Sequence, residues 1–229
     1  MHIKRIPSPK NWPISRKENT WTARPLPGPH GLHKCITVNI ILKEILKIAE
    51  TTKEVKKILQ DGKLFINKIK RNEYKFPVGI MDIIEVPDLK IQNIVLYNKN
   101  GDFILKEIKD SKTKLCKVTG KTVVKNKKIQ IHLHDGRNKL LDKNAYTVGD
   151  TIVLDLEKGD IKDTLKLEKG AVIYLTDGSY VGNVGKVDKI ENGTFDKKAK
   201  IIFTIGTKKY ETLKDYAFVI GKEKPVIDI

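Results

Sequence analysis

Cysteine, long apolar runs and acidic charge are all scarce in this sequence of 229 residues. Its two cysteines, Cys35 and Cys116, exclude a small scaffold held by several disulfides, and they favour a reducing compartment such as the cytoplasm. No apolar run approaches the ~18 residues that a membrane-spanning helix needs. The N-terminus carries charges and prolines where a signal peptide has an apolar stretch. No basic amphipathic helix or lipidation signal stands out, so we expect no membrane partner.

Motifs of catalysis are also missing. The sequence contains no phosphate-binding G-x-x-x-x-G-K-[ST] string, no nucleophile elbow and no paired-cysteine site. Gly178, Gly182 and Gly185 are followed by an expected strand, whereas a nucleotide site needs a helix N-terminus there. Tight turns and close approaches of the backbone explain these glycines better. We therefore predict no enzyme, no cofactor and no small-molecule substrate.

Two clusters of histidines are candidate metal sites. His30, His33 and Cys35 are closely spaced, but a structural zinc site needs four ligands and the sequence offers no fourth nearby. In the second cluster, His132 and His134 would share one face of a strand, with the following aspartate pointing away. A turn over residues 134–138, with its arginine offered to phosphate, is the better interpretation. We predict no metal at either cluster.

Positive charge is what the sequence has in excess. Lys and Arg number 45 against 28 Asp and Glu, which gives a formal net charge of +17. Such a chain attracts phosphates and releases counterions on binding. The excess is positive in each of four successive segments, residues 1–38, 39–87, 88–168 and 169–229. Binding through several surfaces is therefore expected.

The first segment combines cations, prolines and both tryptophans. Six prolines between residues 7 and 29 forbid helix and interrupt strand pairing. Trp12 and Trp21 lie among arginines and lysines, a mixture that suits a polyanion with stackable bases, which means RNA. Residues 1–34 lack the apolar periodicity of a core. We expect an extended arm that is mobile in the free protein and becomes ordered on RNA.

The second segment has helical and then strand periodicity. Residues 39–49 predict an amphipathic helix, and Thr51–Glu54 predicts a capping box that opens a second helix ending at Gly62. Lys53, Lys56 and Lys57 share the face opposite the apolar residues of that helix. A strand over residues 64–66 precedes a basic turn. Short strands separated by turn signals follow from residue 88, with a further unit starting near residue 170.

These patterns predict an α+β, mostly β protein. We expect an extended basic arm (1–38), a small α/β domain (39–87), a central β-barrel or sandwich (88–168) and a C-terminal β unit (169–229).

Several strings resemble those of one known family, the S4e small-subunit ribosomal proteins of archaea and eukaryotes. They span nearly the whole chain: residues 2–6 with Pro9 and Trp12, 24–25, 28–30, Cys35, 61–67, 77–82, 114–118, 134–138, 149–151, 182–187 and 218–222 with 224–225. Pro7, where a small or polar residue is commoner, and Lys68, where a glycine is usual, depart from the family pattern. The chain length resembles that of archaeal members.

The resemblance implies a structural constituent of the small ribosomal subunit that binds and braces small-subunit rRNA. It also implies an S4-type RNA-binding domain over residues 51–86 and a KOW-type (SH3-like) unit around residues 182–187. Expected partners are the rRNA and neighbouring small-subunit ribosomal proteins, in the cytoplasm. One alternative is an RNA-binding factor outside the ribosome that carries the same domains, serving transcription elongation or RNA modification.

The side chains expected to contact RNA are cations, aromatic rings and amides from all four segments. They are Lys4, Arg5, Lys10, Trp12, Arg16, Trp21, Arg24, His30, Lys34, Lys53, Lys56, Lys57, Lys63, Lys68, Lys70, Arg71, Arg137, Asn138, Lys139, Asn183 and Lys186. Their lysines would act as point charges toward phosphates without reading sequence.

Overall fold

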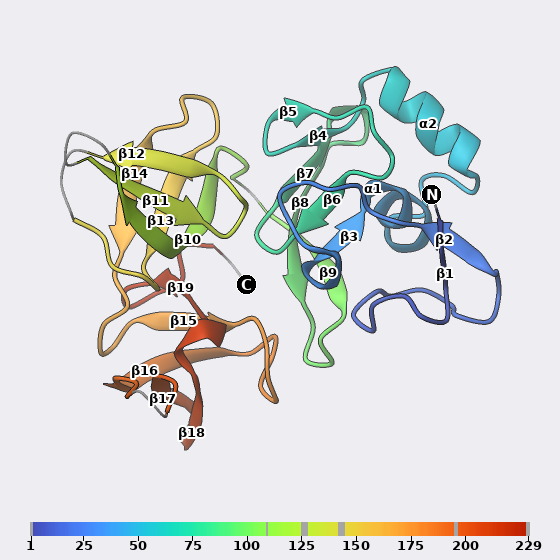
Figure 1. Cartoon of the computed structure of the whole chain (residues 1–229). Coiled ribbons are helices and arrows are strands. Elements are labelled where there is room, and N and C mark those ends of the chain that lie inside the picture. Colours follow the sequence, from blue (N-terminus) through green and yellow to red (C-terminus); the bar gives the residue numbers. More distant parts are fainter. Residues whose placement is uncertain (1, 109, 125–127, 142–144, 195–196, 228–229) are drawn as a thin grey trace. The chain divides into compact units, whose positions relative to one another are not determined.

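The computed structural model describes residues 2–108, 110–124, 128–141, 145–194 and 197–227. The chain divides into two compact units. Unit 1 comprises Met1–Tyr97 and Asp102–Lys114, and unit 2 comprises Asn98–Gly101 and Leu115–Ile229. Antiparallel strands make up most of the regular structure, and the helices are few and short (Figure 1). The predicted α+β, mostly β class is confirmed.

Unit 1 is built around a five-stranded antiparallel sheet. Its strand order is β5 (Ile69–Lys70), β4 (Phe65–Ile66), β7 (Ile83–Val86), β8 (Ile91–Tyr97) and β9 (Phe103–Glu107). All four residues of β7 are buried, which fits the apolar run in the sequence. A separate two-stranded ladder pairs β3 (Cys35–Thr37) with β6 (Pro77–Gly79).

The first predicted helix is shorter than expected. It consists of α1 (Val38–Ile40) and the π-helical turn η2 (Ile41–Ile45), where the Leu46 amide donates to the Ile41 carbonyl. The prediction of a helix through residue 49 is wrong because Lys47 adopts a left-handed φ of 52°, which no right-handed helix continues. Single-turn 3₁₀ segments lie at η1 (Leu32–Lys34) and η3 (Pro87–Leu89) in this unit, and at η5 (Lys214–Tyr216) in unit 2.

The second predicted helix is confirmed as α2 (Thr52–Gln60). The Glu54 amide donates to Thr51 Oγ1 at 3.3 Å, and the Glu54 carboxylate accepts from the Glu50 amide at 2.9 Å. These bonds satisfy amides that a helix N-terminus leaves without partners. Gly62, at φ 74°, lies just beyond its C-terminus. In Figure 1, α2 lies beside the β4–β5 hairpin.

The hairpin turn after β4 explains how this chain accommodates Lys68. Asn67 and Lys68 form a two-residue turn at φ 52° and 63°, between the paired Ile66 and Ile69. Such turns favour glycine at the second position. Lys68 occupies it instead, and its ammonium lies 2.9 Å from Glu85 and from the hydroxyl of Ser111. This lysine therefore makes internal contacts, and its expected contact with RNA stays a prediction.

The N-terminal segment makes contacts within unit 1, although it lacks apolar periodicity, and its mobility in the absence of RNA stays a prediction. β1 (His2–Lys4) pairs with β2 (Trp21–Ala23), and Trp12 is 2% exposed, with its indole N–H 2.7 Å from the Cys35 carbonyl. The prolines do interrupt regular pairing after β1. The Arg16 guanidinium instead binds the carbonyls of Arg5, Ile6, Ser8 and Pro9.

Unit 2 contains two five-stranded antiparallel sheets. The first has the order β12 (Asn138–Leu141), β11 (Ile129–Leu133), β10 (Thr113–Val123), β13 (Thr151–Asp155), β14 (Ile161–Leu165). The second has the order β18 (Lys208–Leu213), β17 (Lys200–Ile205), β16 (Val184–Glu191), β15 (Val172–Leu175), β19 (Ala217–Gly221). β12, β14 and β19 were not predicted, because each is short and lacks clear alternation.

Candidate nucleic-acid interface

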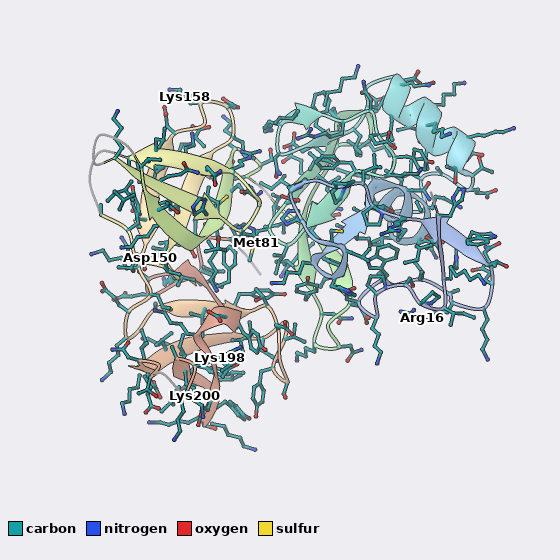
Figure 2. The ribbon with its side chains drawn as sticks, viewed as in Figure 1. Arg16, Met81, Asp150, Lys158, Lys198 and Lys200 are labelled. Carbon is teal, nitrogen blue, oxygen red and sulfur yellow. The ribbon has the colours of Figure 1, made fainter. Side chains whose placement is uncertain are left out.

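The outer face of α2 is a basic surface of unit 1 formed by neighbouring lysines of one helix. Val55 and Leu59 are buried, while Lys53, Lys56 and Lys57 are exposed on the other side. Helical periodicity alone produces this division, as predicted. Figure 2 shows long side chains with nitrogen tips along this helix.

Tyr74 extends this surface beyond the helix. The Lys56 ammonium lies 5.0 Å from the centre of the Tyr74 ring, and the Lys75 ammonium lies 5.2 Å from it. A hydrogen bond with the Tyr74 side chain raises the pKa of Lys75, so this lysine stays protonated. Two cations from different segments are thus gathered around one ring.

The C-terminal end of α2 meets the β4–β5 hairpin. The Lys70 ammonium lies against Gly62, and the Arg71 guanidinium carbon is 4.3 Å from the centre of the Phe76 ring. Lys63, just after the helix, pairs with Asp88 at 3.1 Å. The structure therefore brings the predicted helix face and basic turn into one neighbourhood of unit 1.

Trp21 is the exposed tryptophan. Its side chain is 57% exposed, the Lys4 ammonium lies 5.9 Å from its ring, and the His2 ring centre lies 6.2 Å away. An exposed indole beside a cation offers a face on which a base can stack. Lys10, Arg24 and Lys34 of the same segment are also exposed.

Three other predicted contacts are buried. Trp12, Arg5 and His30 are 2%, 4% and 8% exposed. The Arg5 guanidinium binds Glu44 at 2.6 Å and the Ser15 carbonyl at 2.8 Å. These side chains are engaged within unit 1, and their contact with RNA stays a prediction. Arg16 is engaged as well, since four backbone carbonyls accept from its guanidinium.

His30 belongs to a buried polar cluster centred on Asp82. One oxygen of Asp82 accepts from Lys114 Nζ at 2.7 Å and Asn67 Nδ2 at 2.9 Å. The other accepts from the Gly79 amide at 2.8 Å and lies 3.0 Å from His30 Nε2. Burial alone raises the pKa of this carboxyl group. The Lys114 ammonium, with the His30 and Asn67 hydrogen bonds, outweighs burial and holds the pKa well below its usual range.

The predicted turn after β11 is confirmed. The Gly136 amide donates to the Leu133 carbonyl, and Gly136 adopts φ 76°. Its neighbour Arg137 is partly exposed, with Nε 3.6 Å from the buried Asp135. His132 Nδ1 lies 2.8 Å from Asn138 Oδ1 and His132 Nε2 lies 2.9 Å from Thr122 Oγ1.

Of the remaining candidates in unit 2, two are engaged internally and one is exposed. Lys139 Nζ donates to the Gly159 carbonyl at 2.7 Å, and Asn183 Nδ2 donates to the Tyr180 carbonyl at 3.0 Å. Lys186 on β16 is exposed. Unit 2 therefore presents fewer of its predicted contacts at the surface than unit 1 does.

The cysteine of the first histidine cluster is buried. Burial raises the pKa of the Cys35 thiol to about 12. Among the described residues, no group of three or more His, Cys, Asp or Glu side chains could hold a metal ion. Within the same ranges, no helix is long and apolar enough to cross a membrane.

Sequence reasoning missed Lys75, Tyr74 and Lys114. A lysine beside a tyrosine carries no periodic signal, so the shared ring of Tyr74 could not be foreseen. Lys114 lies at the start of a strand in a basic stretch, and lysine is almost never fully buried unless paired. Its partner Asp82 is 32 residues away in the chain.

The fold and surface define a basic, mostly β protein with exposed cations and buried structural ion pairs. Residues 93–161 match the model of ribosomal family S4e, and residues 1–33 match the RS4NT (NUC023) domain. The small ribosomal subunit protein eS4 of Methanococcus vannielii is 37% identical over 100% of this chain and 97% of its own length. That of Methanocaldococcus jannaschii is 35% identical over the same shares.

A solved structure agrees with the sequence relatives. The crystal structure of the 30S ribosomal protein S4e from Thermoplasma acidophilum has a TM-score of 0.72 and 29% identity, covering 82% of this chain and 96% of that one. The chain belongs to the S4e family of small ribosomal subunit proteins.

Proposed function

We propose that this protein is a structural constituent of the small ribosomal subunit that binds and braces small-subunit rRNA. The observation that carries the proposal is full-length similarity to relatives named small ribosomal subunit protein eS4. The exposed lysines of α2 support it, since they offer charge to phosphates without an enclosed reactive centre. The protein acts on cytoplasmic ribosomes, beside other small-subunit proteins, and needs no cofactor.

In this function α2 and its surroundings form the main phosphate-binding surface. Lys53, Lys56 and Lys57 neutralise the RNA backbone, with Lys63, Lys70 and Arg71 extending the contact past the helix end. Trp21 stacks on a base beside Lys4. In unit 2, Arg137, Asn138 and Lys186 add smaller contacts.

The finer domain assignments are part of the same proposal. An S4-type domain within residues 39–87 is supported by the order α2, β4, β5, β7, with two lysine-bearing elements meeting at the helix end. A KOW-type unit within residues 169–229 is supported by the glycine-rich turn between β15 and β16, where Gly182 adopts φ 75°. Residues 1–38 form the arm, and residues 88–168 form the central β domain.

A function outside the ribosome, as a transcription or RNA-modification accessory, is the alternative. The relatives are named small ribosomal subunit proteins, which does not favour this alternative. Sucrose-gradient sedimentation of the endogenous protein separates the two, because only a ribosomal constituent is stoichiometric in small-subunit fractions. Its absence from these fractions contradicts the proposal.

The α2 surface is tested with a triple variant, Lys53→Ala, Lys56→Ala and Lys57→Ala, measured against small-subunit rRNA at several salt concentrations. Each lost phosphate contact should reduce the slope of log K against log salt by about 0.7–0.9. A matched control replaces three exposed lysines of unit 2 that already pair with acids, namely Lys189, Lys200 and Lys209. A slope that changes equally in both variants, or in neither, means that α2 is only a solvated face.

A further inference from the structure

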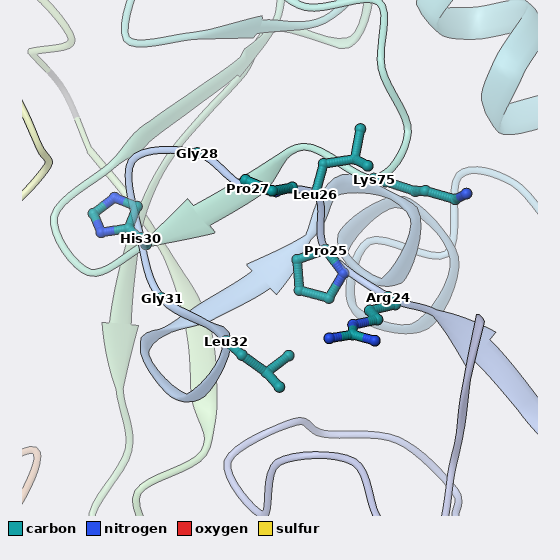
Figure 3. Close-up of a pocket in the computed structure, with 9 residues that line it drawn as sticks. All are labelled: Arg24, Pro25, Leu26, Pro27, Gly28, His30, Gly31, Leu32 and Lys75. Carbon is teal, nitrogen blue, oxygen red and sulfur yellow. The ribbon is translucent and has the colours of Figure 1, made fainter. Parts of the chain in front are cut away.

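A hollow of about 490 Å³ lies inside the bend of residues 24–32 (Figure 3). Pro25, Leu26, Pro27 and Leu32 form its apolar walls, and Arg24 and Lys75 line it as cations. Leu26 is 43% exposed, so part of this apolar wall is open to solvent. A volume of this size lies within the range of small-ligand pockets, about 300–1,000 Å³.

The bend is held open by contacts at both ends. The Leu26 amide donates to the Lys75 carbonyl at 3.1 Å. Gly28 lies so close to Pro77 that an added Cβ would be 2.7 Å from its ring. His30, at the far end, is fixed by its 3.0 Å contact with buried Asp82. The hollow is therefore formed before any ligand arrives, which lowers the entropic cost of binding.

The charges around the hollow have one sign. Among the described residues that line it, two are permanent cations and none is a carboxylate. Lys75 also shares the Tyr74 ring with Lys56 of α2, so the hollow continues the basic helix surface. The apolar walls match the base of a nucleotide, and the adjacent cations match its phosphate. A peptide without acidic groups would leave the two cations without a partner of opposite charge.

We propose that the hollow takes a single unstacked nucleotide of the bound RNA. The base enters between the proline and leucine side chains, and its phosphate lies at Arg24 and Lys75. Single-stranded loops and bulges of RNA supply such splayed bases. The inference rests on the proposed function, and it names a nucleotide subsite at which base shape, and not only backbone charge, contributes to binding.

Gly31 provides a clean test. Its φ is −69°, an ordinary value for any residue, and an added Cβ would meet no atom within 4 Å. Gly31→Phe therefore puts a bulky ring at the hollow without removing a charge. Gly31→Ala adds a Cβ at the same position and leaves the hollow open, so it is the matched control. Both full-length variants are compared with the wild type for binding to small-subunit rRNA transcribed with 4-thiouridine.

Gly31→Phe should bind about tenfold more weakly, which corresponds to the loss of about 1.4 kcal/mol of contact between the base and the apolar walls, while the salt slope stays unchanged. Gly31→Ala should bind like the wild type. Lys75→Met, in contrast, should reduce the slope. Photocrosslinking should join one uridine-containing site to residues 24–32 in the wild type and not in the Gly31→Phe variant.

Equal rRNA affinity and equal crosslinking of both Gly31 variants overturn the nucleotide subsite but leave the proposed function intact. Loss of a neighbouring ribosomal protein from gradient fractions, with rRNA affinity unchanged, also overturns it and assigns the hollow to a protein partner. If the wild type itself does not bind the rRNA, the proposed function fails first. Should Gly31→Phe not fold, the wild-type crosslink decides alone, and its absence from residues 24–32 overturns the proposal.

Discussion

Replacement of Lys114 by methionine tests whether the buried cluster around Asp82 holds unit 1 together. The side chains of Lys114 and Asp82 are 0% and 2% exposed, and their charged atoms are 2.7 Å apart. Methionine keeps most of the apolar length of lysine but removes the ammonium. Asp82 then keeps its contacts with Asn67, the Gly79 amide and His30 but loses the Lys114 ammonium, so it remains a buried carboxylate without that cation. Breaking such a pair costs about 3–5 kcal/mol, a large share of the usual 5–15 kcal/mol of stability.

The assay is urea unfolding at pH 7 followed by tryptophan fluorescence. Both tryptophans lie in unit 1, and Trp12 is 2% exposed, so the signal reports the unit that contains the cluster. This choice matters because a chain of two units need not unfold in one step. The midpoint should fall steeply in the Lys114→Met protein.

Lys63→Met is the matched control. It breaks another lysine–aspartate pair of unit 1, with Asp88 at 3.1 Å, whose side chains are 46% and 55% exposed. Water screens that pair, so the unfolding midpoint should barely move. A Lys114→Met midpoint as close to the wild type as that of the control would refute the argument that burial makes this pair structural.

Three further outcomes follow from the same unit. The stability that Asp82 contributes is present above its ordinary pKa of 3.8 and is lost as pH falls toward its lower folded pKa, so Asp82→Asn should flatten the acid limb of stability measured by urea unfolding at several pH values. Gly79→Ala should destabilise by about 1–3 kcal/mol in urea, since an added Cβ would lie 2.5 Å from the His30 ring, whereas Gly31→Ala should not. Trp12→Phe should cost about 1–3 kcal/mol by leaving a buried carbonyl without its donor, and an unchanged midpoint would contradict this.

Local signals predicted the elements that local physics determines. The capping box at Thr51 and the apolar face of α2 depend on residues three and four apart, and both are confirmed. Many strands of unit 2 also follow from alternation and turn glycines. The π-helical turn η2 and the left-handed Lys47 could not be foreseen, because they depend on how the helix end meets the rest of unit 1.

The candidate site was predicted less completely, because composition does not tell which cations face outward. Lys56 and Arg5 both lie in basic stretches of the sequence. Lys56 is nevertheless exposed, whereas Arg5 is buried, with 4% of its surface exposed. The difference arises from contacts distant in sequence, such as Arg5 with Glu44. Helical periodicity supplied the missing information for α2. The proline-rich arm has no periodicity, so nothing in its sequence assigned each side chain to the inside or the outside.

Two arginines of the arm, Arg5 and Arg16, form hydrogen bonds within the protein, and these bonds affect the entropic cost of RNA binding by this segment. The Arg16 guanidinium donates to four carbonyls of the arm, and Trp12 is 2% exposed with its indole N–H bound to the Cys35 carbonyl. Ordering a free backbone costs about 1–2 kcal/mol per residue, a cost that a mobile arm would incur on binding. The contacts of Arg16 and Trp12 within the protein offset part of that cost. Trp21 and the hollow of residues 24–32 belong to the same segment, so RNA that binds them has less of it left to order.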